Sequence, residues 1–296
     1  MPATSRWRIR RDDLTARAVL LPTVVLTLVF VYGFILFTVY LSFSASKILP
    51  DLRWIGTDNY VRLFKLSTWF TALKNMGIFA VLYIGLSTII GLVLAILIDL
   101  SKKAERVFRQ IYLYPMAISF IVTGTAWKWF LDPGIGLERI IRSLGFDAFR
   151  FDWIKNSDMA IYTVVIAAVW QVSGYVMIIF LAGLRAVPHE SIESAVVDGA
   201  SIWKLYTRVV IPQLRPSFLT VFVILGHMAI KSYDLVIALT GGGPGRATEL
   251  PSTFMYSYTF TRNQMGIGAS SAVFMLLVFG IIIVPYLRAQ VRGEQA

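Results

Sequence analysis

The chain has 296 residues, of which 57% are hydrophobic and only 15% are charged, and its mean hydropathy is +0.69. Soluble domains carry roughly 25% charged residues, so this composition excludes an ordinary soluble globular protein and predicts a protein embedded in the lipid bilayer. The net charge of +11 is spread over short segments between apolar runs rather than gathered in one patch, so we expect no nucleic-acid partner.

The first element is an apolar run preceded by arginines. Residues 1–17 contain Arg6, Arg8, Arg10, Arg11 and Arg17, as the start of a signal peptide would. The apolar run over 18–43 is nevertheless longer than the ~7–15 residues of a signal peptide and long enough to cross ~30 Å of hydrocarbon. We therefore predict an uncleaved first membrane helix after a basic, cytoplasmic N-terminal segment.

Five further apolar runs approach the ~20 residues that a helix needs to cross a bilayer with all its backbone groups satisfied. They cover residues 75–97, 109–130, 159–184, 217–239 and 268–286. The predicted fold class is thus an all-α, polytopic membrane protein with six transmembrane helices. It forms one membrane domain over 18–286, followed by a short cytoplasmic tail over 287–296, and no linker or internal repeat divides it.

Orientation follows from the basic residues of the short connections. Lysines and arginines cluster before the first run, after the second, after the fourth and after the sixth; beyond the N-terminal arginines they are Lys102, Lys103, Arg106, Arg109, Lys204, Arg208, Arg215, Arg288 and Arg292. The positive-inside rule assigns that side to the cytoplasm, so both termini are expected there, although basic residues in 44–74 weaken the bias. The expected location is the bacterial inner membrane.

Two outer segments carry turn and interface residues. Asp132-Pro-Gly and the glycine-rich 241–245 are chain breakers, and Trp127, Trp129, Phe130 and Trp153 suit an aromatic belt. The glycine run lacks the lysine of a P-loop, and no P-loop occurs elsewhere. We therefore expect no cofactor on this chain, and ATP with Mg²⁺ has to bind a partner.

The polar stretch 187–212, between the fourth and fifth runs, predicts two short helices joined at a bend. Pro188 and Glu190 suit a first helical turn, because proline lacks a donor that the turn does not use and a carboxylate faces the positive helix end. Asp198-Gly199 is a stop signal, Ser201 can cap the second helix, and Pro212 is expected to end it. An amphipathic connector lying on the membrane surface would show the same features.

The spacing within this stretch resembles the signature of importer-type ABC transporter permeases. That signature has a glutamate, two alanines, a glycine six residues after the glutamate, and an isoleucine-x-leucine-proline ending. The chain departs from it by Ser194, Val209 and Ile211, all of them small-for-small or aliphatic-for-aliphatic changes. The resemblance implies that the residues at or beside the signature positions couple the chain to an ATPase; they are Glu193, Ala195, Asp198, Gly199, Val209, Ile211 and Pro212.

In that family the loop is a coupling helix that fits a cleft on a separate ATP-hydrolysing subunit. The resemblance implies that Glu193 meets a basic residue there, that Gly199 permits the bend and that Ala195 permits close approach. Segments 232–245, 248–249 and 256–260 look similar to carbohydrate importer permeases of the maltose type. Segments 109–116, 122–129 and 227–234 look closest to bacterial glucose/mannose and glucoside permeases. This implies a second permease subunit, two ATP-binding subunits, an extracytoplasmic sugar-binding protein and a sugar substrate.

Polar side chains within the spans are the candidates for a substrate pathway, because they are expensive in lipid. In the fifth span His227, Lys231 and Asp234 stand at i, i+4 and i+7, on one stripe of a continuous helix. A pair that holds helices together explains them equally well. In the fourth span the candidates Trp170, Gln171, Ser173 and Tyr175 would suit sugar binding or packing between helices.

Other functions have less support. The coupling signature says nothing of cargo, so an importer of polyols or glycerol phosphate is the main alternative, although the spans hold almost no arginine for a phosphate ester. An intramembrane enzyme would rest on His227 and Asp234 without an obvious nucleophile, and a channel would need a repeated filter. With only two histidines, His189 and His227, and no cysteine, we expect no metal site.

Overall fold

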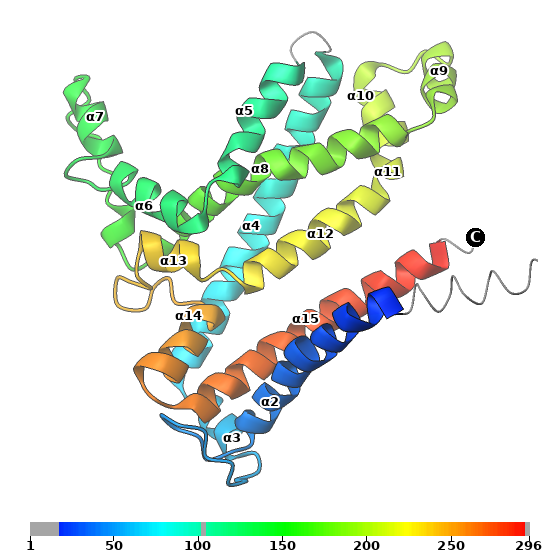
Figure 1. The fold of residues 1–296 in the computed structure, drawn as a ribbon. Helices are drawn as coiled ribbons and strands as arrows, with labels where there is room; N and C mark the ends of the chain where they lie inside the picture. Colours follow the sequence, from blue (N-terminus) through cyan, green and yellow to red (C-terminus); the bar gives the residue numbers. More distant parts are fainter. Residues whose placement is uncertain (1–17, 102–104, 294–296) are drawn as a thin grey trace, which may run out of the picture. The chain divides into compact units, whose positions relative to one another are not determined.

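The computed structural model describes residues 18–101 and 105–293, and these are helical almost throughout (Figure 1). Within the described ranges there is no strand, and the one isolated bridge joins Ser44 to Trp54. The predictions for residues 1–17, Lys102, Lys103 and the tail after 293 lie outside these ranges. The chain divides into two compact units, which are described separately: 18–63 with 257–273, and 64–256 with 274–293.

The first unit contains the N-terminal membrane helix and the start of the last one. The helix Ala18–Ser42 includes the π-wound η1 (Thr27–Tyr32) and α2 (Gly33–Ser42). It is followed by α3 (Asp58–Leu63), η4 (Ser257–Thr261) and the first turns of α15 (Met265–Gly293). Asn59 joins α3 to the end of α2, because its Nδ2 donates to the carbonyl oxygens of Ser42 at 3.0 Å and Ser44 at 2.8 Å.

The second unit is built on two long helices, α4 (Ser67–Leu100) and α8 (Ala160–Ala186), which pack along each other. Its other helices before α8 are α5 (Glu105–Ala117), α6 (Phe120–Phe130), α7 (Leu137–Ser143) and the 3-10 turn η2 (Trp153–Lys155). After α8 come α9 (His189–Val197), α10 (Ile202–Leu205), η3 (Tyr206–Val210), α11 (Ile211–Gln213), α12 (Arg215–Ile230), α13 (Asp234–Leu239) and α14 (Pro251–Tyr256).

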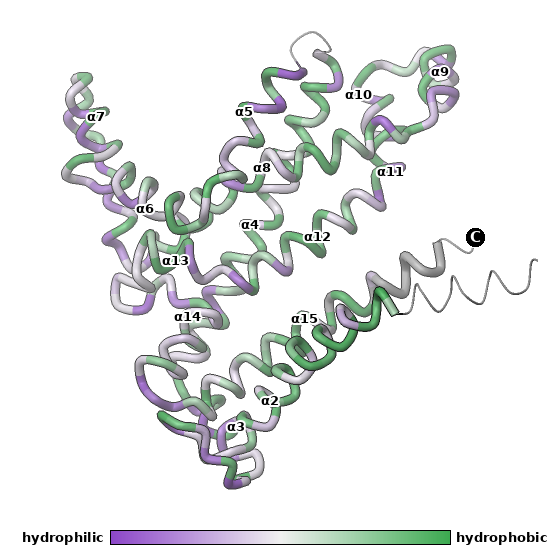
Figure 2. The backbone as a smooth tube through the Cα atoms, in the orientation of Figure 1, coloured by the Kyte–Doolittle hydropathy of each residue, from purple (hydrophilic) through white to green (hydrophobic). Residues whose placement is uncertain are grey.

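Three described helices are long and apolar enough to cross a membrane: Ala18–Ser42, Ser67–Leu100 and Ala160–Ala186. A bent pair, Ile202–Gln213 with Arg215–Ile230, would make a fourth if it forms one span. The hydropathy-coloured trace shows long apolar stretches along α4, α8 and α12, and more polar segments at their ends (Figure 2). The all-helical membrane fold is therefore confirmed, while the count of six spans and the position of the termini stay predictions.

Two of the predicted spans are not continuous helices. The third, 109–130, is broken between α5 and α6, where Ser119 adopts extended dihedrals (φ −64°, ψ 149°) and its Oγ accepts a hydrogen bond from the amide of Val122. Pro115 lies one turn before this break and removes a backbone donor. The fifth, 217–239, is broken between α12 and α13 over residues 231–233. Both breaks belong to helices that pack together, α6 against α13.

Close helix contacts at glycine hold the second unit together. A Cβ on Gly174 of α8 would overlap the carbonyl oxygen of Tyr112 in α5, and one on Gly124 of α6 would meet the backbone of Leu235 in α13. In lipid, helices associate through such close backbone packing rather than through burial of apolar surface from water. The glycines therefore place α5 on α8 and α6 on α13, and these contacts bring the two breaks together.

Candidate functional site

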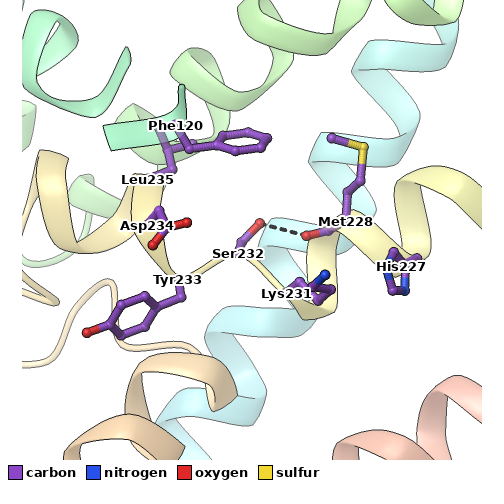
Figure 3. A pocket seen from close by; sticks show the side chains of 8 residues that line it. All are labelled: Phe120, His227, Met228, Lys231, Ser232, Tyr233, Asp234 and Leu235. Carbon is purple, nitrogen blue, oxygen red and sulfur yellow. Dashed lines mark hydrogen bonds between the residues drawn. The ribbon is translucent and has the colours of Figure 1, made fainter. Parts of the chain in front are cut away.

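A cavity of about 250 Å³ lies at the two helix breaks. Phe120, the first residue of α6, lines it from one side; the remaining lining residues are Met228, Ser232, Tyr233, Leu235 and the charged or ionisable His227, Lys231 and Asp234 (Figure 3). The cavity is thus formed by the end of α12, the start of α13 and the start of α6. Discontinuous helices of this kind leave backbone groups free, and in transporters they build the substrate site.

Side chains from other helices satisfy backbone groups at both breaks. Gln171 of α8 donates its Nε2 to the carbonyl oxygen of Ile118 at 2.7 Å, and Ser252 of α14 donates its Oγ to the carbonyl oxygen of Ser232 at 2.8 Å. The Oγ of Ser232 itself donates to the carbonyl oxygen of Met228 at 3.0 Å. Because an unpaired peptide group is costly within a membrane, these bonds stabilise the broken conformation.

The predicted stripe of His227, Lys231 and Asp234 on one helix is wrong. The helix α12 ends at Ile230, Lys231 is its C-cap, and Asp234 begins α13. All three nevertheless line the same cavity, and all three residues are exposed. Lys231 and Asp234 form no ion pair within 4 Å in the described structure, and the His227 ring packs against Phe279 with centroids 5.0 Å apart.

The four candidates in α8 lie apart from the residues that line this cavity. Gln171 and Ser173 are buried, at 1% and 8% exposure, and Ser173 Oγ donates to the carbonyl oxygen of Trp170 at 3.4 Å. Trp170 is 41% exposed and meets Trp127 edge-on with ring centroids 5.8 Å apart, while Tyr175 is half-buried. Gln171 thus bonds the backbone of Ile118, two residues before Phe120, which lines the cavity. A sugar contact by any of the four stays a prediction.

The loop 187–212 contains the predicted pair of helices with the bend at Gly199. The amide of Gly199 donates to the carbonyl oxygen of Val196 and that of Ala200 to the carbonyl oxygen of Ala195, both at 3.0 Å. With Gly199 at φ +74°, these two bonds form a Schellman motif, the common way to end a helix on a glycine. Ser201 precedes α10 with extended dihedrals, but its side chain makes no capping bond.

Large apolar side chains are exposed on this loop. Val197 is 87% exposed, Trp203 78%, Ile202 67% and Val196 56%, and the predicted contact residue Glu193 is also exposed beside the half-buried Ala195. Exposed apolar groups gathered on a polar loop mark an interaction site rather than a free surface. The loop therefore offers both an apolar patch and a carboxylate to another molecule.

In the second half of the loop, the chain runs without interruption from α10 through the π-wound η3 into α11, as one helical segment over Ile202–Gln213. Pro212 is the last residue but one of this segment, and a bend of 64° at Leu214 separates it from α12, so the predicted helix end is confirmed to within one residue. A proline is expected at such an end because it cannot supply the backbone donor of a continuing helix. Val209 and Ile211 are half-buried and Leu214 is fully buried, so this half anchors the loop to the helices.

Polar contacts of the loop with α4, and of α8 with α5, have no signal in the sequence. The hydroxyl of Tyr206 in η3 donates to Oδ2 of Asp99 at the end of α4, at 3.2 Å. Arg185, at the end of α8, lies 2.6 Å from Glu105, at the start of α5, and Arg109 lies 3.7 Å from the same carboxylate. The hydrogen bond from Arg185 holds the pKa of Glu105 below its ordinary value. Glu105 therefore remains charged and paired at neutral pH.

Comparison with known sequences finds one family over most of the chain. The model of the family described as "Binding-protein-dependent transport system inner membrane component" matches residues 87–293. A probable ABC transporter permease protein of Pyrococcus horikoshii is 38% identical and covers 93% of this chain and 95% of its own length. The xylose/arabinose import permease protein of Haloferax volcanii is 32% identical over 90% of this chain and 85% of its own length.

A trehalose/maltose transport system permease protein of Thermococcus litoralis is 27% identical over 96% of both chains. Among solved structures, a chain of a bacterial ABC transporter involved in the import of the acidic polysaccharide alginate superposes with a TM-score of 0.83. It covers 97% of this chain and 98% of its own, at 24% identity. That likeness is one of fold, and it agrees with the helical arrangement described above.

Proposed function

Because this chain belongs to the family of binding-protein-dependent transport system inner membrane components, we propose that it is the permease subunit of an ATP-driven importer of sugars or related polyols. The observation that carries the proposal is the cavity where two broken helices meet. Some transport proteins bind a polar solute within the membrane at such breaks. Here the side chains that line the cavity would make the contacts, since the carbonyl oxygens of Ile118 and Ser232 already accept hydrogen bonds.

The lining of the cavity favours a neutral solute with hydroxyl groups. Lys231 and Asp234 bring one charge of each sign, and Phe120 and Tyr233 bring aromatic surface. Sugars use aromatic surface together with hydrogen-bonding groups. A phosphate ester such as glycerol phosphate, the alternative cargo, would be better served by a cluster of arginines, and no arginine lines this cavity.

Relatives named for sugars support the carbohydrate class and not one particular sugar, and a relative named for sn-glycerol-3-phosphate transport supports the alternative cargo. One is an importer of xylose and arabinose and another of trehalose and maltose, so related permeases serve pentoses and disaccharides alike. Glucose/mannose or glucoside uptake is the specific cargo that we propose for this chain, from the resemblance of its segments. The bacterial inner membrane is the proposed location.

In the proposed mechanism, the chain forms the pathway with a second permease, and two separate subunits bind ATP with Mg²⁺. An extracytoplasmic binding protein delivers the sugar, and this chain moves the sugar without changing it chemically. Glu193 and the exposed apolar patch of loop 187–212 contact the ATPase on the cytoplasmic side. Closure of the ATPase pair then moves the loop, and the helices attached to it open the cavity first outward and then inward.

The test is uptake of labelled sugars by cells with and without this chain, with ATP depletion as the control. The panel contains glucose, mannose, trehalose, maltose and glycerol phosphate. We expect ATP-dependent uptake of one sugar to disappear without the chain. Loss of glycerol phosphate uptake alone would favour the alternative cargo. If cells without the chain still took up every solute at the same rate, with the partner proteins present, the proposed transport of these solutes would be overturned.

A further inference from the structure

The short helix α7 has its acidic residue buried against the segment that follows it. Glu138 is only 5% exposed; its Oε2 accepts a hydrogen bond from the amide of Phe151 at 2.9 Å, and its Oε1 lies 3.4 Å from Arg142. Arg142 also donates its Nε to the carbonyl oxygen of Asp147 at 3.1 Å. The buried acid and its arginine therefore fix α7 to the segment that follows it.

The apolar stripe of α7 points the other way. Leu137, Ile140, Ile141 and Leu144 recur at helical spacing, on the side opposite Glu138 and Arg142. Ile140 is 51% exposed and Leu144 is 71% exposed. Leu137 and Ile141 are half-buried, so α7 exposes the part of its apolar stripe that contains Ile140 and Leu144, while it buries its acid.

The exposed apolar surface extends to the residues on both sides of α7. Trp129 and Phe130, the last residues of α6, are 64% and 43% exposed, and Ile135 and Phe146 are 61% and 66% exposed. Farther along, Phe151 stacks on Trp153 with ring centroids 4.8 Å apart. Tryptophan and other aromatic residues gather where a membrane helix meets water, so the end of α6 marks that boundary.

We propose that α7 lies in the membrane–water interface, with Ile140 and Leu144 inserted among lipid chains and Arg139 facing headgroup phosphates. Lipid is favoured over a protein partner by continuity with α6, whose own apolar side chains are exposed up to its last residue. Charge agrees as well, because the acid of α7 is buried while Arg139 is exposed. Amphipathic interfacial helices carry this combination of exposed apolar and basic residues.

The absence of cysteine permits a direct test with single-cysteine variants. Leu144→Cys and Ile140→Cys are each labelled with an environment-sensitive dye in the assembled transporter, reconstituted in vesicles containing doxyl-labelled phosphatidylcholine. Ser157→Cys, in the exposed turn before α8, is the control in water. We expect doxyl lipid to quench the dye at 140 and 144 several-fold more than iodide in the water does, and the reverse at 157.

Other outcomes contradict the proposal in distinguishable ways. Strong iodide quenching at 144 would place the stripe in water, and protection from both quenchers would mean that a protein subunit covers it. The headgroup contact is tested with Arg139→Gln on the labelled Leu144→Cys background. Adding phosphatidylglycerol to the vesicles should raise doxyl quenching in the parent and not in this variant; an equal rise in both would overturn the role of Arg139. None of these readouts depends on the transported solute.

Discussion

The hydroxyl of Tyr206 donates a hydrogen bond to Oδ2 of Asp99 at 3.2 Å, and this bond joins the loop 187–212 to the end of α4. Burial of the phenol, together with the charge of Asp99, raises the pKa of Tyr206 to about 12. The phenol therefore stays protonated and remains a donor at any physiological pH. A loop that has to transmit movement needs such a connection, because apolar contacts alone allow sliding.

Replacing Tyr206 with phenylalanine removes this bond and keeps the ring. We expect Tyr206→Phe to lower the free energy of unfolding by about 0.5–1.5 kcal/mol, the usual net value of one hydrogen bond. Transport per ATP hydrolysed should fall several-fold in proteoliposomes while ATPase activity persists. The matched control is Tyr112→Phe, a half-buried tyrosine on α5 that stacks on Phe108. Equal transport per ATP in both variants would argue against a coupling role for the bond.

Gly199 ends α9 with φ +74°, a conformation that residues with a Cβ rarely adopt. Gly199→Ala should destabilise the end of α9 by about 1 kcal/mol, and the bulkier Gly199→Leu should in addition uncouple ATP hydrolysis from transport. Gly56→Ala is the control, because Gly56 has φ +63° and open space but lies outside the loop. Normal coupling in a correctly assembled Gly199→Leu transporter would contradict the coupling assignment.

Gly174 and Gly77 are both helical glycines, but only Gly174 touches a neighbouring backbone. A Cβ on Gly174 would overlap the carbonyl of Tyr112, whereas nothing lies within 4 Å of a Cβ on Gly77. Gly174→Ala should therefore destabilise the protein by about 1–3 kcal/mol, the typical effect of overpacking. Gly77→Ala should be neutral or slightly stabilising. Thermal unfolding of the purified variants checks this, and similar melting temperatures would mean that α5 and α8 do not pack closely.

Asp234 and Lys231 line the cavity without pairing to each other within 4 Å in the described structure. If they bind sugar hydroxyls, Asp234→Asn and Lys231→Gln should each raise the KM for uptake by about tenfold, since hydrogen bonds to charged groups contribute about 1.5–3 kcal/mol. Assembly should be unaffected. Asp158→Asn, at an exposed turn before α8, is the control for charge. An unchanged KM in both cavity variants would remove these residues from the substrate pathway.

The pair of Glu105 and Arg185 predicts a pH dependence of stability. The hydrogen bond from Arg185, with the added charge of Arg109, lowers the pKa of Glu105 from its ordinary value of 4.5. A carboxyl group whose pKa is lower in the folded protein than in the unfolded chain stabilises the fold. This stabilisation is fully present at a pH above the unfolded pKa, and it is lost as the pH falls through the lower, folded pKa. The melting temperature of the parent should exceed that of Glu105→Gln above about pH 5, and the difference should vanish in stronger acid.

The membrane class, the helical fold and the bend at Gly199 could all be predicted from the sequence, because each depends on local chemistry. Apolar runs the length of a bilayer predict spanning helices wherever they occur, and a glycine after Asp198 ends a helix whatever surrounds it. The spacing from Glu193 to Pro212 likewise identified the loop that the proposed function uses. None of these inferences requires knowledge of which segments meet.

Only the tertiary structure placed the helix breaks and the cavity between them. Ile118 and Tyr233 are compatible with a helix, and the breaks are stabilised by distant side chains, because Gln171 bonds the carbonyl oxygen of Ile118 and Ser252 bonds that of Ser232. The bond from Tyr206 to Asp99 spans 107 positions in the same way. Hydropathy is a property of neighbouring residues, whereas the satisfaction of a buried polar group depends on residues far along the chain. Hence the six apolar runs were visible in the sequence, and the cavity that three helix ends form was not.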